Sequence, residues 1–189
     1  MYNQVRKQKR VKKIMTEISN LMQRLWDLVF KIEDKYLQTT VKSIFIDQYS
    51  IFKTKPAARR HHHNYKHGLL EHSIEVTEMA LKMSEINNLD NDIVILAGLL
   101  HDIGKIIDYN MNNNGIVTYN SESEGHFIEG IKIVKNTLLS TKVKEILINV
   151  IKSHHNLIEW GSLKRPENEL EWIIHLSDMW SANVKGKKK

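Results

Sequence analysis

The 189-residue chain carries 28 Lys and Arg against 22 Asp and Glu, a formal net charge of +6 at pH 7, and 41% of its residues are hydrophobic. This length and balance predict one folded domain and exclude a disordered chain, and the absence of cysteine excludes a disulfide scaffold and a thiolate metal site. No apolar run approaches the ~18 residues that a membrane span needs, and no apolar stretch of a signal peptide follows the basic N-terminus, so we expect a cytoplasmic protein without a membrane partner.

The positive charge lies mostly at the two ends of the chain. Residues 1–13 hold six Lys or Arg and no acid, and residues 185–189 hold four Lys, whereas the rest of the chain has 18 basic and 22 acidic residues. The high net charge therefore does not by itself indicate a nucleic-acid binder. Residues 51–70 differ, with five Lys or Arg, four His and no acid. This segment could attract phosphates, or it could be a solvated basic loop.

The first half of the chain is predicted to be helical. Apolar residues recur at helical spacing along residues 4–36, which predicts one or two amphipathic helices, and again along residues 40–53. A further helix is expected at residues 68–86. The acidic and amide side chains of residues 90–92 should cap the next helix, residues 93–103, which is apolar nearly all round and should lie at the centre of the core.

The second half begins with a polar stretch and returns to helix. Residues 109–125 read as a loop that contains a short hairpin at residues 116–119. Three further helices are predicted, at about residues 126–139, 142–153 and 167–183. Strand-like alternation is scarce elsewhere, so the sequence predicts an all-α single domain.

Several histidines and acids occupy positions where a plain helix would place an apolar residue. The set comprises His72, His101, Asp102, His126, His154, His155 and Asp178. A single inward histidine is more often a hydrogen-bonded core residue than a ligand, but here five separate segments each place such a residue inward. Burying these groups without partners is costly, and a shared metal would satisfy all of them. Imidazole and carboxylate without thiolate suit Mn, Fe, Co, Ni or Zn, and disfavour Mg or Ca alone.

Three stretches of the chain carry a family likeness. They are FKTKPAARRHHHNYKHGLLEH at residues 52–72, LLHDIGK at residues 99–105, and SHHNLIEWGSLKRPENELEWIIHLSD at residues 153–178. Together they resemble the HD superfamily of metal-dependent phosphohydrolases, and most closely the HD domain of YhaM-type 3′→5′ exoribonucleases. The likeness covers about residues 50–182.

The resemblance implies an all-α HD-domain helical bundle with an N-terminal helical extension. We expect a basic amphipathic extension at residues 1–50, the metal-dependent phosphohydrolase domain at residues 51–184 and a basic tail at residues 185–189. YhaM-type proteins usually carry an OB-type nucleic-acid-binding domain before the HD domain, whereas about fifty helical residues precede the match here. This departure leaves the choice of substrate open.

The HD pattern also implies how one or two divalent ions would be held. The first ion would take four ligands: His72, His101, Asp102 and Asp178. The second ion would share Asp102 and take imidazoles from His126, His154 and His155. Whether both of the paired histidines bind is left open. The two ions would activate a shared water as the hydroxide that attacks phosphorus, with manganese as the expected metal.

Asp102 and Lys105 are the candidate catalytic residues. Lys105 lies one turn beyond His101 and could stabilise phosphate charge, or it could simply complement the helix dipole near a C-terminus. Five side chains of the basic segment are candidates for binding phosphates or stacking on a terminal base: Arg59, Arg60, His62, His63 and Tyr65.

Three hypotheses of different class follow. The leading one is a metal-dependent phosphodiesterase that acts as a 3′→5′ exonuclease on single-stranded RNA, with DNA as a further substrate. The alternative is an HD phosphohydrolase acting on a small nucleotide or cyclic (di)nucleotide. The third is a non-catalytic nucleic-acid-binding module. The amphipathic stretch at residues 4–36 could form a homo-oligomer contact, although packing within the chain explains it equally well.

Overall fold

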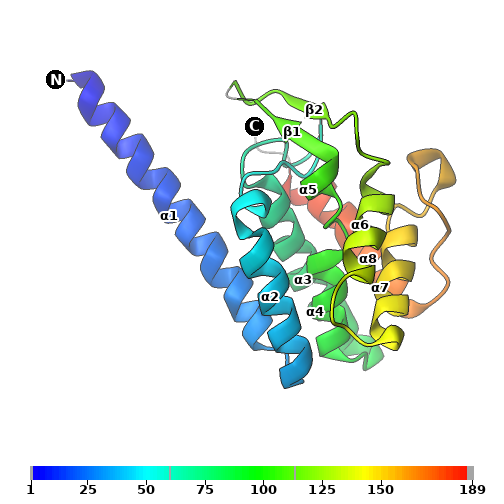
Figure 1. The fold of residues 1–189 in the computed structure, drawn as a ribbon. Coiled ribbons are helices and arrows are strands. Elements are labelled where there is room, and N and C mark those ends of the chain that lie inside the picture. The colour runs from blue at the N-terminus through cyan, green and yellow to red at the C-terminus, as the bar shows by residue number, and fades with distance from the viewer. Residues whose placement is uncertain (1, 60, 113, 187–189) are drawn as a thin grey trace.

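The computed structural model describes residues 2–59, 61–112 and 114–186, which form a bundle of helices with one small hairpin (Figure 1). The helices are α1 (Tyr2–Phe30), α2 (Lys35–Phe52), α3 (Gly68–Asn87), α4 (Asn91–Leu100), α5 (Lys105–Asp108), α6 (His126–Lys135), α7 (Thr141–Ser153) and α8 (Glu169–Trp180). The antiparallel strands are β1 (Tyr109–Met111) and β2 (Val117–Tyr119). The predicted all-α fold is therefore confirmed. A hairpin is present, but the predicted range 116–119 covers only its second strand.

A tight turn separates α1 from α2, so α1 accounts for most of the predicted stretch 4–36, and the predicted segment 40–53 corresponds to α2, which begins five residues earlier. Asp34 caps α2, because its carboxylate accepts hydrogen bonds from the backbone N–H groups of Tyr36 and Leu37. The Asp92 carboxylate at the start of α4 accepts two backbone N–H bonds from this turn, both at 2.8 Å. These bonds fix the C-terminal end of α1 on the bundle, while Figure 1 shows α1 leaving the bundle toward its N-terminus.

The apolar core centres on α4, as its sequence predicts. Val94, Leu96 and Leu99 of α4 are fully buried, and they belong to one hydrophobic cluster with residues of α1, α2, α3, α7 and α8. Because Phe45 and Phe52 of α2 join this cluster, the predicted boundary at residue 50 falls inside a helix of the common core. No helix in the described part of the chain is long and apolar enough to cross a bilayer.

The C-terminal end of α4 is pressed against the start of α6. The helix ends at Leu100, three residues earlier than predicted, and residues 101–104 form a turn. A Cβ atom at Gly104 would lie 1.9 Å from the carbonyl oxygen of His126, so only glycine permits this approach. The turn thus places the end of α4 directly beside the first residue of α6.

Two of the later helices are shorter than predicted. α6 ends at Lys135 instead of near residue 139. α8 begins at Glu169 because Asn168 caps it, its side chain accepting a hydrogen bond from the backbone N–H of Glu171 at 3.0 Å. α8 continues into a π-helical turn at Ser181–Lys185, which the sequence did not predict.

Candidate metal centre

Five helices bring the predicted ligands to one end of the bundle. The candidate ligands come from five segments: His72 on α3, His101 and Asp102 after α4, His126 at the start of α6, His154 and His155 after α7, and Asp178 on α8. The side chains of His72, His101, Asp102 and His154 are at most 1% exposed. These groups are therefore inside the fold, where an unpartnered polar atom is costly.

Asp102 is the residue that joins the cluster. Its Oδ2 atom lies 3.4 Å from Nε2 of both His72 and His101, and its Oδ1 atom lies 3.3 Å from Nε2 of His154. Ligand atoms of Asp102, His72 and His101 lie within 4.8 Å of one another. The carboxylate thus has imidazole nitrogens on both of its oxygens.

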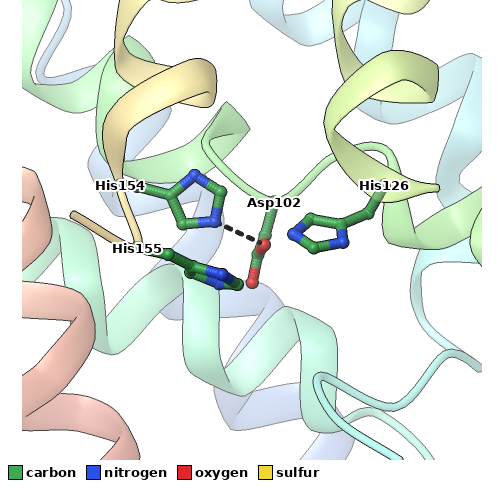
Figure 2. A group of neighbouring side chains, drawn as sticks. All are labelled: Asp102, His126, His154 and His155. Atoms are coloured by element: carbon green, nitrogen blue, oxygen red, sulfur yellow. Dashed lines mark ion pairs between the residues drawn. The ribbon is translucent and has the colours of Figure 1, made fainter. Parts of the chain in front are cut away.

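A second group shares the same carboxylate. Ligand atoms of Asp102, His126, His154 and His155 also lie within 4.8 Å of one another. Figure 2 shows the rings of His126 and His154 on either side of the carboxylate, with His155 next to them. Both of the paired histidines therefore reach this group. The structure therefore brings two groups of candidate ligands together at Asp102.

Backbone carbonyls orient two of the imidazoles toward Asp102. Nδ1 of His101 lies 2.8 Å from the carbonyl oxygen of Gly98, and Nδ1 of His154 lies 2.8 Å from that of Ile151. Because a carbonyl only accepts, Nδ1 carries the proton and donates it in both contacts. The lone pair is then on Nε2, the atom that faces Asp102, which is the arrangement found in metal-binding histidines.

Asp178 closes the first group from α8. Its Oδ1 atom lies 3.1 Å from Nε2 of His72. Burial alone would raise the pKa of Asp178, but the bond with His72 and the surrounding imidazoles hold it below the usual range. Burial alone would lower the pKa of His72, and its bonds with Asp102 and Asp178 raise it instead. Nε2 of His72 thus lies within reach of two carboxylates, those of Asp102 and Asp178.

Lys105 forms a buried ion pair with the central carboxylate. Its ammonium nitrogen lies 2.5 Å from Oδ2 of Asp102, and the lysine is 4% exposed. Burial would raise the pKa of Asp102, but the Lys105 charge and His101 hold it well below its usual range. Burial lowers the pKa of both His101 and His126, so these imidazoles are neutral, as metal ligands must be.

Three atoms of the second group lack hydrogen-bond partners among the described residues. They are Oδ1 of Asp102, Nε2 of His126 and Nε2 of His154, and all three are buried. Buried polar atoms are normally paired, and each of these can donate an electron pair. Three such atoms turned toward one another fit a divalent cation. Imidazole and carboxylate ligands suit a transition metal, so the residues present fit the ion that the sequence predicts.

The predicted substrate residues lie on the loop between α2 and α3. The rings of His62 and His63 lie 4.9 Å and 5.4 Å from the ring of His72, measured between centroids. The Tyr65 ring lies 5.8 Å from that of His63, and its hydroxyl donates to Glu71 at 2.6 Å. The structure thus brings the two histidines to the metal ligands, with Tyr65 behind them.

The charge predicted for this loop is only partly present beside the ligands. Burial, together with the neighbouring His72 and Lys105, lowers the pKa of His62 to about 3, so this imidazole is neutral. Arg59 is exposed, and its guanidinium lies over the ring of Tyr119 in β2 at 5.2 Å from the centroid. Arg60 lies outside the described residues. His62 can exchange hydrogen bonds with a phosphate, but it brings no positive charge to it.

Glu75 and Ser181 contact the site and were not predicted from the sequence. Ser181 Oγ lies 3.0 Å from Nδ1 of His72 and donates to Glu75 at 2.9 Å. The only sequence signal for Glu75 is its place three residues after His72 on one helix, which is weak. Ser181 has no signal, because the contact spans more than a hundred residues.

Comparisons with known proteins point to the same site. Residues 69–183 match the family model described as HD domain, which is more than half of the chain and includes every proposed ligand. A weak match covers residues 5–114 and carries the description "Putative helicase". The sequence contains no G-x-x-x-x-G-K-[ST] loop of the kind that cradles nucleotide phosphates, so this match carries no further argument. No solved structure matches the chain.

Proposed function

The chain belongs to the HD domain family, which indicates a metal-dependent hydrolase, and from this premise we propose a phosphodiesterase that acts as a 3′→5′ exonuclease on single-stranded RNA, with DNA as a further substrate. The observation that carries the proposal is the Asp102 carboxylate, which two imidazole groups share and whose buried Oδ1 has no hydrogen-bond partner among the described residues. The 3′ polarity rests on the resemblance to YhaM-type proteins. We propose the cytoplasm as the compartment.

Two ligand sets are proposed around Asp102. One set would be completed by His72, His101 and Asp178, and the other by His126, His154 and His155. When bound, divalent ions polarise a phosphoryl group and lower the pKa of water. We propose Mn²⁺, with Fe, Co, Ni and Zn as the other ions that this donor set accepts.

Lys105 is proposed as the second catalytic residue beside Asp102. Its ammonium group is held beside the candidate ligands by Asp102 Oδ2 at 2.5 Å and is almost completely buried. A charge in such a site acts on a neighbouring phosphoryl oxygen with little screening by water. Lys105 would therefore stabilise the negative charge that develops on the phosphate oxygens, while it keeps Asp102 ionised.

The burial of the candidate ligands favours a substrate that presents a strand end. Four of the ligands are at most 1% exposed, and His62 and His63 lie against His72. A strand end can enter such a site more easily than the middle of a strand. On the outside, Arg59 could bind a following phosphate, and Tyr65 lines a hollow of about 530 Å³ that could receive a base.

The same burial also favours the second candidate function. A small nucleotide or cyclic (di)nucleotide would fit a buried centre without requiring a track for a strand. The two candidate functions differ in whether Arg59 and Tyr65, in the loop between α2 and α3, must bind the nucleotides that follow the cleaved one. Replacing Arg59 should weaken long substrates more than short ones for the exonuclease, and equally for the alternative.

The deciding experiment uses single-stranded RNA labelled at its 5′ end, incubated with the protein and Mn²⁺ beside a panel of small nucleotides. A ladder that shortens from the 3′ end, absent with the Asp102→Asn variant, supports the exonuclease. Turnover of a small nucleotide without a ladder replaces it with the second candidate. Absence of both from protein that has bound Mn²⁺ would contradict the proposed hydrolase.

A further inference from the structure

A chain of buried polar contacts leads away from the metal centre behind His72. Nδ1 of His72 lies 3.0 Å from Ser181 Oγ, which donates to Oε2 of Glu75 at 2.9 Å. The same Oε2 atom lies 3.2 Å from Nε2 of His63. The four side chains join α3, the loop before it and the turn after α8. None of them is more than 9% exposed.

The directions of these hydrogen bonds follow from counting protons. A serine hydroxyl has one proton, and here Ser181 gives it to the Glu75 carboxylate. Its oxygen must then accept from His72, so Nδ1 of His72 carries a proton. When the ring is neutral, the lone pair available to a metal is therefore on Nε2, which faces Asp102 and Asp178. The serine thus selects the ring nitrogen that is free to bind.

Glu75 is ionised although it is buried. Burial alone would raise its pKa, but hydrogen bonds with His63 and Ser181 lower it below the ordinary value. A buried carboxylate that is paired in this way orients its partners strongly, because charge-assisted hydrogen bonds are about twice as strong as neutral ones. Glu75 therefore holds Ser181 and His63 in fixed positions.

The backbone around these side chains is unusual at three points. His63 has a left-handed φ of 48°, which is rare for a residue other than glycine. Ser181 begins the π-helical turn after α8, and such turns are often found at functional sites. A Cβ atom at Gly68 would lie 1.9 Å from the carbonyl oxygen of His63. Strained conformations of this kind persist where the surrounding structure holds them, and they cluster at functional sites.

We propose that Glu75 and Ser181 are positioning residues for the metal ligand His72. Through His63, Glu75 and Ser181 would also hold the loop between α2 and α3 against the metal centre. The proposal rests on the proposed metal site, since it concerns a ligand of that site. Outer partners of this type typically change metal affinity by about 10–100-fold when they are removed. Neither Glu75 nor Ser181 would touch the ion or the reacting phosphate.

The test compares two serines that are equally buried. Ser181→Ala removes the hydroxyl that holds His72, whereas Ser73→Ala removes a buried hydroxyl for which the structure shows no hydrogen-bond partner among the described residues. Metal-free protein is titrated with Mn²⁺ by calorimetry. We expect Ser181→Ala to weaken binding by about 10–100-fold and Ser73→Ala to leave it within about twofold. Glu75→Gln, which keeps the shape of the side chain, is the second variant and should weaken binding as well.

The second readout is the tautomer of His72 in protein loaded with diamagnetic Zn²⁺. Long-range ¹⁵N–¹H NMR spectra should show the proton on Nδ1 in the wild type, and a changed Nδ1 environment in Ser181→Ala. Equal Mn²⁺ affinity for Ser181→Ala, Glu75→Gln and Ser73→Ala, in a wild type that binds Mn²⁺, would overturn the inference alone. A wild type that binds no Mn²⁺ would overturn the proposed function together with it.

Discussion

The middle of α4 and the turn just beyond its C-terminal end are buried to the same extent by opposite means. Toward its middle, Val94 and Leu96 are fully buried among other apolar side chains. Just beyond its C-terminal end, His101 and Asp102 are buried among imidazoles, a carboxylate and an ammonium group. Apolar burial stabilises the fold by about 25 cal/mol per Å² removed from water, whereas burial of charges opposes folding unless they are paired.

The difference shows which part of the molecule is arranged for a ligand. In the middle of α4, each buried apolar side chain packs against other apolar side chains of the fold. At the polar end, Oδ1 of Asp102 and Nε2 of His126 and His154 are buried without hydrogen-bond partners among the described residues. The middle of α4 therefore contributes apolar burial to the core, whereas the turn beyond its C-terminal end carries an unsatisfied set of electron-pair donors. Four predictions test this division.

The largest effect is expected from Asp102→Asn. The change removes the charge that both ligand groups share, so hydrolysis of any substrate that the wild type accepts should fall below detection. It also leaves the Lys105 ammonium buried without its partner, at a cost of about 3–5 kcal/mol in the free energy of unfolding of the metal-free protein. Leu96→Ala, in the apolar middle of α4, is the control. It should lower the free energy of unfolding by about 2–5 kcal/mol, while metal binding and activity per folded molecule persist. Activity that survives in Asp102→Asn would remove this site from the reaction.

The next largest effect is expected from Gly104→Ala. The new methyl group would lie 1.9 Å from the carbonyl oxygen of His126 and 2.5 Å from the backbone nitrogen of Gly130, so the end of α4 and the start of α6 must separate. Overpacking of this kind costs about 1–3 kcal/mol, or more where backbone is the obstacle, and it should move His126 away from Asp102. Unfolding in urea and Mn²⁺ titration would measure the two effects.

Gly130→Ala is the matched control for that change. Its added carbon would meet neighbours at 3.4–3.5 Å, which is ordinary contact. Replacing a helical glycine with alanine then favours the helix by up to about 1 kcal/mol. If both alanine variants bound Mn²⁺ and unfolded alike, the contact between Gly104 and α6 would have no part in placing His126.

Metal removal should have an intermediate effect. An ion present at about 100 times its dissociation constant stabilises the folded state by about 2.7 kcal/mol. For a chain of this length that corresponds to a rise in Tm on the order of 5–10 °C. Thermal melts with Mn²⁺ and with excess chelator would show the difference in the wild type, and no difference in Asp102→Asn. Identical melts for the wild type in both conditions would indicate that the unpaired atoms hold no ion.

The smallest effect is expected at the ion pair between α1 and α3. The Arg24 guanidinium donates two hydrogen bonds to the Glu78 carboxylate, at 2.9 Å and 2.6 Å, and both side chains are more than one third exposed. Exposed pairs contribute about 0.2–1 kcal/mol. A double-mutant cycle of Arg24→Ala and Glu78→Ala should give a coupling free energy in that range with unchanged activity. A coupling free energy above about 2 kcal/mol would contradict the expectation that this exposed ion pair contributes little to stability.

The sequence indicates the candidate ligands because buried histidines and acids break the apolar pattern of a helix. A histidine such as His72 or an acid such as Asp178 stands out on an otherwise apolar helix face, and the position alone shows that it points inward. The family resemblance then divided the set into two groups that share Asp102. In the structure, Asp102 lies with His72 and His101 and also with His126, His154 and His155, while Asp178 contacts His72.

Features that depend on contacts between distant segments were not predicted. Ser181 and Glu75 are separated by 106 positions, and neither residue type is unusual where it stands. The effect of burial on His62 is likewise not visible in the sequence, where this residue stands among basic side chains, whereas in the fold burial keeps its imidazole neutral. The break between α1 and α2 depends on Asp92, which lies far along the chain and bonds to the turn.

The most direct test of the metal centre is anomalous X-ray diffraction at the manganese edge from crystals of protein grown with Mn²⁺. Density is expected beside the Asp102 carboxylate, between it and the Nε2 atoms of the surrounding histidines, on the side of His126 and His154 and on the side of His72 and His101. Crystals that contain Mn²⁺ at saturating concentration but show no anomalous density within bonding distance of Asp102 would contradict the account.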